Sequence, residues 1–287
     1  MSSVIEETWQ HEYILTNGIK LHYVTKGQGP LMLMLHGFPE FWYSWRHQIP
    51  EFAKDYKVVA LDLRGYNKSD KPQDSSAYVM SEFIKDIEGV IKGLGYSNCV
   101  LVGHDWGGMI AWNFAYAHPE MLERLIVLNI PHPAKFAQGL LTPQQLLKSA
   151  YVFFFQLPLL PEALIQSSDY QAIESAFKGM AVDKSAFTKA DIEAYKNAAS
   201  RRGALTAMLN YYRNVFGGLV RKDWTVLDVP TLMIWGEDDT ALGKELTYGT
   251  EVYVRNFQIK YIVNCSHWVQ QEQPALVNQY MREFLAS

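Results

Sequence analysis

A series of short apolar runs, separated by segments with helical spacing, constrains the fold of this chain more than any other feature. The continuous runs lie at Leu31–Leu35, Lys57–Leu63, Cys99–Val102 and Leu125–Leu128. Runs of this length are typical of strands that are buried on both faces of a sheet. Helical spacing is found between them, over Phe41–Phe52, Ser81–Gly95 and Met109–Ala117. This alternation predicts an α/β fold with a mostly parallel central sheet flanked by helices.

The alternation stops in the middle of the chain and resumes near its end. Two more strands are expected before the first run, at Glu12–Leu15 and Ile19–Val24, and two more after the interruption, at Thr231–Trp235 and Ile259–Val263, followed by a helix at Ala275–Leu285. Residues 132–223 offer helical segments rich in Phe and Tyr instead. We therefore expect a core domain of residues 1–131 and 224–287, with an inserted α-helical cap at 132–223. A set of ordinary core helices is the alternative.

Composition narrows the classes of protein that need to be considered. The 287 residues are 48% hydrophobic and 20% charged, which excludes a disordered chain. The net charge of −4 gives no basic excess for nucleic acid. The two cysteines, Cys99 and Cys265, favour a reducing compartment, and the first residues lack the features of a signal peptide, so we expect a cytoplasmic protein. Polar residues interrupt Tyr151–Ile165, the longest apolar stretch, so no membrane span is expected. We expect a monomer or a homodimer.

The pentapeptide Gly103–Gly107, with the letters GHDWG, is the strongest motif for chemistry. It follows an expected strand and precedes an expected helix, with small residues on both sides of Asp105. This pattern is typical of a tight strand-to-helix turn that exposes a nucleophile above a sheet. Asp105 as the cap of the following helix is the alternative.

An aspartate at this position changes the chemistry that a serine would perform. A carboxylate can displace a leaving group at saturated carbon, which gives an alkyl ester on Asp105. Water must then attack the ester carbonyl, and an oxyanion forms on the Asp105 side chain. The backbone N–H of Trp106 is one expected donor to this oxyanion. The N–H of Phe38, in the motif His36-Gly37-Phe38-Pro39 after an expected strand, is the other.

Hydrolysis of the ester requires a general base, and His267 is the candidate. It follows the last expected strand and is the only histidine after residue 132. Neutral imidazole is the available base near pH 7, and a carboxylate must hold its tautomer. Asp239 is our choice for this carboxylate, whereas Glu237 and Asp238 are interpreted as loop or capping acids. A packed loop histidine is the alternative for His267.

Several motifs together carry a family resemblance. They are HGFPE at 36–40, DLRGY at 62–66, GHDWGG at 103–108, PHP at 131–133 and SHW at 266–268. The chain resembles the epoxide hydrolase branch of the α/β-hydrolase family over nearly its whole length, and its nucleophile, acid and histidine follow one another in that family's order. The resemblance implies an α/β-hydrolase fold with a cap, and the conversion of epoxides to vicinal diols.

The resemblance also implies that two cap tyrosines hold the epoxide oxygen. Tyr151 resembles the first and Tyr212 the second, with Tyr211 as the alternative for the second. A phenol stays protonated at pH 7 and is acidic enough to polarise the ring. Phe38, Trp106, Phe153, Phe154 and Trp268 are expected to line an apolar pocket, although core packing is the alternative for the phenylalanines.

Related families use the same aspartate. Haloalkane dehalogenases share Trp106, but many have Asn at the position of Phe38. Fluoroacetate dehalogenases have Arg where this chain has Trp106, and a His-Trp pair where it has Tyr151-Val152. A haloalkane or haloacid dehalogenase is thus the second hypothesis, and a ligand-binding relative without catalysis is a third.

The sequence contains no motif that would indicate other chemistries. No Gly-x-Ser-x-Gly occurs that would indicate a serine esterase. Neither a metal-ligand spacing nor a glycine-rich nucleotide loop is present, so no metal and no organic cofactor are expected. The expected partners are a small apolar epoxide and water.

Overall fold

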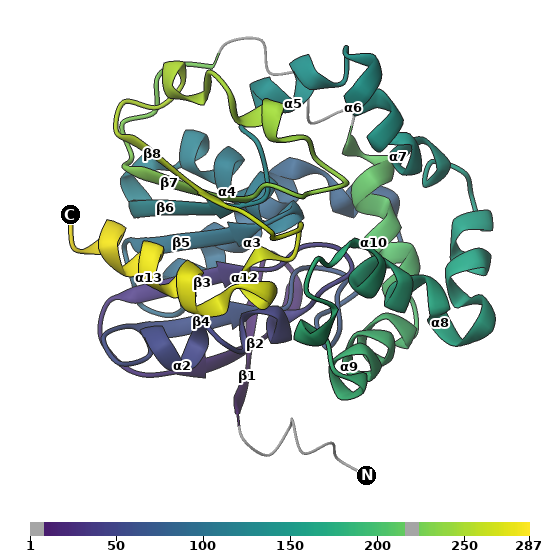
Figure 1. Ribbon diagram of the computed structural model, residues 1–287. Coiled ribbons are helices and arrows are strands. Elements are labelled where there is room, and N and C mark those ends of the chain that lie inside the picture. Colours follow the sequence, from purple (N-terminus) through teal and green to yellow (C-terminus); the bar gives the residue numbers. More distant parts are fainter. Residues whose placement is uncertain (1–8, 216–223) are drawn as a thin grey trace.

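The computed structural model of the protein describes residues 9–215 and 224–287, and its strands form one sheet (Figure 1). The strands are β1 Gln10–Thr16, β2 Ile19–Lys26, β3 Leu31–Leu35, β4 Lys57–Leu61, β5 Cys99–His104, β6 Leu122–Leu128, β7 Thr231–Gly236 and β8 Phe257–Ile262. Their order across the sheet is β1-β2-β4-β3-β5-β6-β7-β8. β2 is antiparallel to β1 and β4, and all other neighbours are parallel. The prediction of a mostly parallel α/β sheet is confirmed.

Helices cover both faces of this sheet (Figure 1). They are α2 Ile49–Phe52, α3 Met80–Gly93, α4 Trp106–Ala117, α12 Val269–Glu272 and α13 Pro274–Leu285. In Figure 1, α2, α12 and α13 lie in front of the sheet and α3 and α4 behind it. The helix expected over Phe41–Phe52 is interrupted: Trp42–Trp45 is a 3₁₀ helix, and α2 follows separately. Pro50 has no N–H to donate to the preceding turn, which explains why one continuous helix does not form.

The segment between β6 and β7 is helical and lies beside the carboxyl ends of the parallel strands (Figure 1). It contains α5 Pro133–Gly139, α6 Pro143–Lys148, α7 Ala150–Phe154, α8 Leu160–Met180, α9 Lys189–Ser200 and α10 Ala204–Arg213. α8 is broken within its length, because Ser168, Asp169 and Tyr170 adopt left-handed φ angles of 50°, 55° and 56°. The expected end of the cap, at 216–223, lies outside the described residues.

The core lies between the sheet and its helices, and it fixes where the loops emerge. Leu33, Val59, Leu101, Ile126 and Met233 have no solvent-exposed surface. Because β3, β5, β7 and β8 are parallel, the loops that follow them meet at one edge of the sheet. In the parts of the chain that the structure describes, every helix is too short or too polar to cross a lipid bilayer.

Candidate active site

Asp105 occupies a strained turn between β5 and α4. Its φ of 49° and ψ of −121° lie outside the regions that side chains other than glycine prefer. Glycines make the turn possible, since a Cβ on Gly103 would lie 2.5 Å from the carbonyl oxygen of Gly107, and one on Gly107 would lie 2.5 Å from that of His36. The Asp105 carboxylate makes no capping hydrogen bond to α4. The side chain is therefore held out from the turn and is not used to end the helix.

The loop after β3 brings a backbone donor to this carboxylate. The N–H of Phe38 donates to Asp105 Oδ1 at 2.8 Å. This approach requires Gly37, because a Cβ there would lie 2.5 Å from the same oxygen. In the described part of the chain, the N–H of Trp106 makes no hydrogen bond to the Asp105 carboxylate. Its role as a second oxyanion donor stays a prediction.

His267 lies between two carboxylates. Its Nδ1 is 2.7 Å from Asp239 Oδ2, and its Nε2 is 3.6 Å from Asp105 Oδ2. Asp239 is fixed in turn by the Asn129 amide, which donates to Oδ2 at 2.8 Å. The backbone N–H groups of the two residues at 241 and 242 donate to its Oδ1 at 2.8 and 2.9 Å. The structure thus brings Asp239 to the histidine, whereas Glu237 pairs with Lys244.

The charges of these three groups depend on one another. Burial alone would lower the pKa of His267, but the carboxylates of Asp239 and Asp105 raise it to about 10. Burial likewise acts to raise the pKa of each carboxyl, and the imidazolium outweighs it, so that both pKa values lie below the ordinary value. The resting site therefore holds a protonated histidine between two carboxylates at neutral pH.

A buried polar network supports the loops from behind. Glu40 accepts hydrogen bonds from the Gly37 N–H at 2.9 Å and from His104 Nδ1 at 2.8 Å, while His104 Nε2 lies 2.8 Å from the His267 carbonyl oxygen. The amides of Gln270 and Gln271 donate to the other Glu40 oxygen. The network joins the loop that contains Phe38, the Asp105 turn and the His267 loop. It was not foreseen from the sequence, although Glu40 and His104 lie within the quoted motifs.

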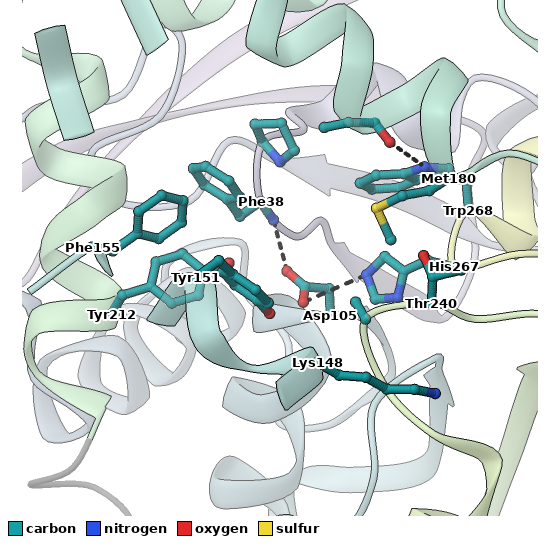
Figure 2. A pocket seen from close by; sticks show the side chains of 13 residues that line it. Phe38, Asp105, Lys148, Tyr151, Phe155, Met180, Tyr212, Thr240, His267 and Trp268 are labelled. Atoms are coloured by element: carbon teal, nitrogen blue, oxygen red, sulfur yellow. Dashed lines mark hydrogen bonds and ion pairs between the residues drawn. The ribbon is translucent and has the colours of Figure 1, made fainter. Parts of the chain in front are cut away.

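These groups meet in a cavity of about 280 Å³ between the sheet and the helical segment (Figure 2). Its lining residues are Phe38, Pro39, Asp105, Lys148, Tyr151, Phe155, Ala176, Met180, Tyr212, Thr240, Ala241, His267 and Trp268. A separate hollow of about 30 Å³ also touches Asp105, Tyr151 and Tyr212, and is otherwise lined by apolar side chains that include Trp106 and Val152. The Asp105 carboxylate is thus placed where the two spaces meet.

Two phenols from the helical segment face Asp105 across the cavity (Figure 2). Tyr151 comes from α7 and Tyr212 from α10, and their ring centroids are 5.8 Å apart. Burial, followed by nearby charged groups that include Asp105, raises the pKa of both hydroxyls, so both remain protonated donors at neutral pH. The hydroxyl of Tyr211 points elsewhere and donates to the carbonyl oxygen of Arg64 at 2.7 Å. The geometry therefore groups Tyr212 with Tyr151.

Comparisons with known proteins identify the family of this chain. Residues 30–274 match the family model described as the alpha/beta hydrolase fold. Epoxide hydrolase 3 of Xenopus tropicalis is 48% identical over 96% of this chain and 78% of its own length, and Epoxide hydrolase 4 of Mus musculus is 46% identical over 95% and 78%. A solved structure of a Bacillus megaterium epoxide hydrolase with an inhibitor is 40% identical, with a TM-score of 0.88, and covers 96% of this chain and 100% of that one.

This chain belongs to the epoxide hydrolases of the α/β-hydrolase family. The sequence identifies only some of the side chains that line the pocket of this epoxide hydrolase. Phe38 and Trp268 line the main cavity, and Trp106 lines the smaller hollow. Phe153 is 47% exposed, and neither it nor Phe154 lines either space, whereas Phe155 does.

Helical spacing explains why Phe155 lines the cavity and Phe153 and Phe154 do not, and it could have been used to predict Phe155. Lys148 at the end of α6, Tyr151 in α7 and Phe155 directly after α7 all line the cavity, and they are three and four residues apart. Met180 reaches the cavity from distant α8, and Thr240 from the loop after β7, and no sequence pattern predicts either. Within the described residues, no cluster of three or more His, Cys, Asp or Glu side chains is arranged to hold a metal ion.

Proposed function

We propose that this protein hydrolyses small apolar epoxides to vicinal diols through an alkyl ester on Asp105. The observation that carries the proposal is the placement of the Asp105 carboxylate opposite Tyr151 and Tyr212 in one cavity. A nucleophile and two O–H donors are what opening of an epoxide requires, because the leaving oxygen stays in the site and must receive a proton.

In the first step, Asp105 Oδ2 attacks one ring carbon. A new C–O bond forms, the ring C–O bond breaks, and its electron pair passes to the ring oxygen. Tyr151 and Tyr212 donate hydrogen bonds to this oxygen as its charge grows, and one of them supplies the proton. The proton that His267 releases after ester formation restores this tyrosine and leaves a neutral imidazole for the second step. The hydrogen bond from Phe38 to Oδ1 supports this assignment, since it leaves Oδ2 as the oxygen free to react.

In the second step, His267 accepts a proton from water, and the water oxygen attacks Cγ of Asp105. The oxyanion forms at Oδ1, where the N–H groups of Phe38 and Trp106 act as donors. Collapse breaks the bond between Cγ and Oδ2, and the His267 imidazolium gives its proton to Oδ2, which leaves as a hydroxyl of the diol. The Asp105 carboxyl group that remains, with one oxygen from water, then passes its proton to His267 and restores the resting site. Ester formation removes one of the carboxylate charges that raise the pKa of His267, so we expect this pKa to fall when the base is needed.

The helical segment acts in this proposal as the cap of residues 132–223 over a core of 1–131 and 224–287. It supplies both tyrosines, and Phe155 and Met180 from this segment form part of the apolar wall of the cavity in which the ester is held. The hollow of about 30 Å³ beside Trp106 has no room for a large group, which favours epoxides with one large substituent. A variant of the Bacillus megaterium epoxide hydrolase was solved with its product, a naphthyloxy-propanediol, which has one such substituent.

We also propose a cytoplasmic monomer or homodimer. Both cysteines, Cys99 and Cys265, are free and buried, which supports a reducing compartment. Fractionation of the source cells, together with light scattering on the purified protein, tests the location and the oligomeric state.

The first experiment measures diol and bromide in the same samples, with aryl and alkyl epoxides and matched bromoalkanes as substrates. We expect diol from the epoxides with the natural protein, and none with Asp105→Ala. Release of bromide without diol would instead indicate a dehalogenase, and diol formation by Asp105→Ala would refute Asp105 as the nucleophile.

A second experiment separates the two steps. His267→Gln should still form the ester but not hydrolyse it, so intact-mass measurement should find the protein heavier by one substrate. In a single turnover of the natural protein in ¹⁸O-labelled water, the label should enter Asp105 and not the diol. Label in the diol would show direct attack by water and would contradict the ester.

A further inference from the structure

The cavity contains one cation that the proposed reaction does not use. Lys148 ends α6 and lies on the same face as Tyr151 and Phe155, so its side chain forms part of the cavity wall (Figure 2). Most of the surrounding side chains are apolar or belong to the reaction itself. Lys148 as a whole is half-buried, and an ammonium group loses hydration in such a place unless a partner compensates for it.

No carboxylate of residues 9–215 or 224–287 supplies that compensation. Within the described residues, no Asp or Glu oxygen lies at ion-pair distance from Lys148 Nζ. Among the residues that the structure places, the ammonium has one partner at the limit of hydrogen bonding, the carbonyl oxygen of Asp239 at 3.5 Å. By contrast, Lys178 and Lys244, which are also half-buried, both pair with glutamates. Lys148 thus has unused donors beside the space where a substrate binds.

We propose that Lys148 binds a carboxylate carried by the substrate, so that epoxides with an acidic tail are preferred over their neutral analogues. This inference rests on the proposed function, because it names the class of epoxide that the same cavity takes. In Figure 2 the Lys148 side chain extends away from Asp105, on the side of His267 opposite Trp268. The carboxylate must therefore be separated from the ring by several atoms, with apolar structure between them.

The test compares para-carboxystyrene oxide with its methyl ester, together with terminal epoxides of straight-chain acids of increasing length and their methyl esters. With the natural protein we expect a higher kcat/KM for each acid of suitable length than for its ester, with an optimum chain length. Lys148→Met should lower kcat/KM for the acids about tenfold and change the esters less than about twofold, because only the acids lose a charge-assisted hydrogen bond. Lys148→Arg should restore most of the preference.

Lys85→Met is the matched control, since it removes the same charge from an exposed lysine on α3. We expect it to leave the ratio of acid to ester unchanged. An equal loss on acids and esters in Lys148→Met would show that the lysine only supports the Asp239 loop, and would overturn the inference. Equal kcat/KM for acid and ester in the natural protein would also overturn it.

A binding measurement separates this inference from the proposed reaction. The diol of para-carboxystyrene oxide, titrated calorimetrically, should bind the natural protein about tenfold more tightly than it binds Lys148→Met. The methyl ester of this diol should bind the two proteins with equal affinity. If the natural protein forms no diol yet shows this difference, the proposed function fails and the anion site stands. If it forms diol and binding does not depend on Lys148, the anion site fails alone.

Discussion

At the residue scale, the surroundings of the tyrosine hydroxyls separate the two proposed donors from a tyrosine that is packed in the core. Tyr151 and Tyr212 line the cavity beside Asp105. We expect Tyr151→Phe and Tyr212→Phe each to slow ester formation about 10- to 100-fold, because one of two donors to the ring oxygen is lost. The double variant should form the ester more slowly than either single variant. Rapid-quench measurement of the ester under single-turnover conditions checks this prediction.

Tyr211→Phe is the internal control for this series. The Tyr211 hydroxyl donates to the Arg64 carbonyl, and its ring stacks on Phe83 at a centroid distance of 4.4 Å. Its loss should lower the free energy of unfolding by about 1 kcal/mol and leave ester formation nearly unchanged. If Tyr211→Phe slowed ester formation as much as Tyr212→Phe, the pairing of Tyr212 with Tyr151 would be wrong.

The sequence predicts some site residues more readily than others for a physical reason. Asp105 is recognisable because its turn requires glycines two residues away on each side, Gly103 and Gly107, and these lie within the same five-residue motif. Phe153 and Phe154 were wrongly expected in the cavity, because the direction of a helical side chain depends on where α7 starts and on its neighbours. Asn129 supports Asp239 from a distance of 110 residues, which no local pattern records.

At the element scale, the turn between β5 and α4 is predicted to tolerate no side chain at Gly107. A Cβ there would collide with the backbone carbonyl oxygens of Leu35 and His36, which belong to a buried strand and its end. We expect Gly107→Ala to lower the free energy of unfolding by about 3 kcal/mol or more, and to abolish activity by displacing Asp105, the proposed nucleophile. Urea unfolding and diol formation measure the two effects.

Gly179→Ala is the matched control for this substitution. Gly179 lies near the end of α8, and nothing approaches its Cβ position within 4 Å. Alanine should stabilise the protein by about 0.5–1 kcal/mol there, because glycine costs more entropy in a helix. A similar, small effect at Gly107 would mean that the β5–α4 turn is not closely packed.

The strands were easier to predict than the helices between β6 and β7. Each buried strand is a short apolar run with a defined end, and β3 has the expected bounds. α8 instead contains three consecutive left-handed residues, Ser168, Asp169 and Tyr170, none of them glycine. A break of this kind depends on tertiary contacts between distant parts of the chain, which a local sequence pattern does not contain. The same break directs the second part of α8, with Met180, toward the cavity.

At the scale of the whole molecule, polar contacts fix the helical segment to the sheet domain around the cavity. The Trp268 indole donates to the Ala176 carbonyl oxygen at 3.2 Å, and the Tyr43 hydroxyl donates to Asp191 at 3.0 Å. Arg46 also lies 3.4 Å from Asp191. The three titratable groups of the site, Asp105, Asp239 and His267, are buried in the folded protein, so the protonation of the site is coupled to folding.

The sign of this coupling follows from the pKa of His267. The folded protein raises it to about 10, and an unfolded chain returns it to about 6.5. Between these values the folded state binds one proton more than the unfolded state. The stabilising contribution of His267 is therefore fully present below pH 6.5 and is lost as the pH rises toward 10. Asp105 and Asp239, whose pKa values are lowered, affect stability at acidic pH instead, where protonation of their carboxylates removes their contribution to stability.

Urea unfolding at several values between pH 7 and 9 should therefore show a steeper loss of stability with pH in the natural protein than in His267→Gln. The difference in slope should approach about 1.4 kcal/mol per pH unit, the value for one proton, because glutamine does not titrate. Asp239→Asn should give an intermediate slope, since it removes the carboxylate closest to the imidazole and lowers the pKa of His267. Parallel curves for the natural protein and His267→Gln would mean that His267 is neutral in the resting site, and that formation of the ester is not needed to release its proton.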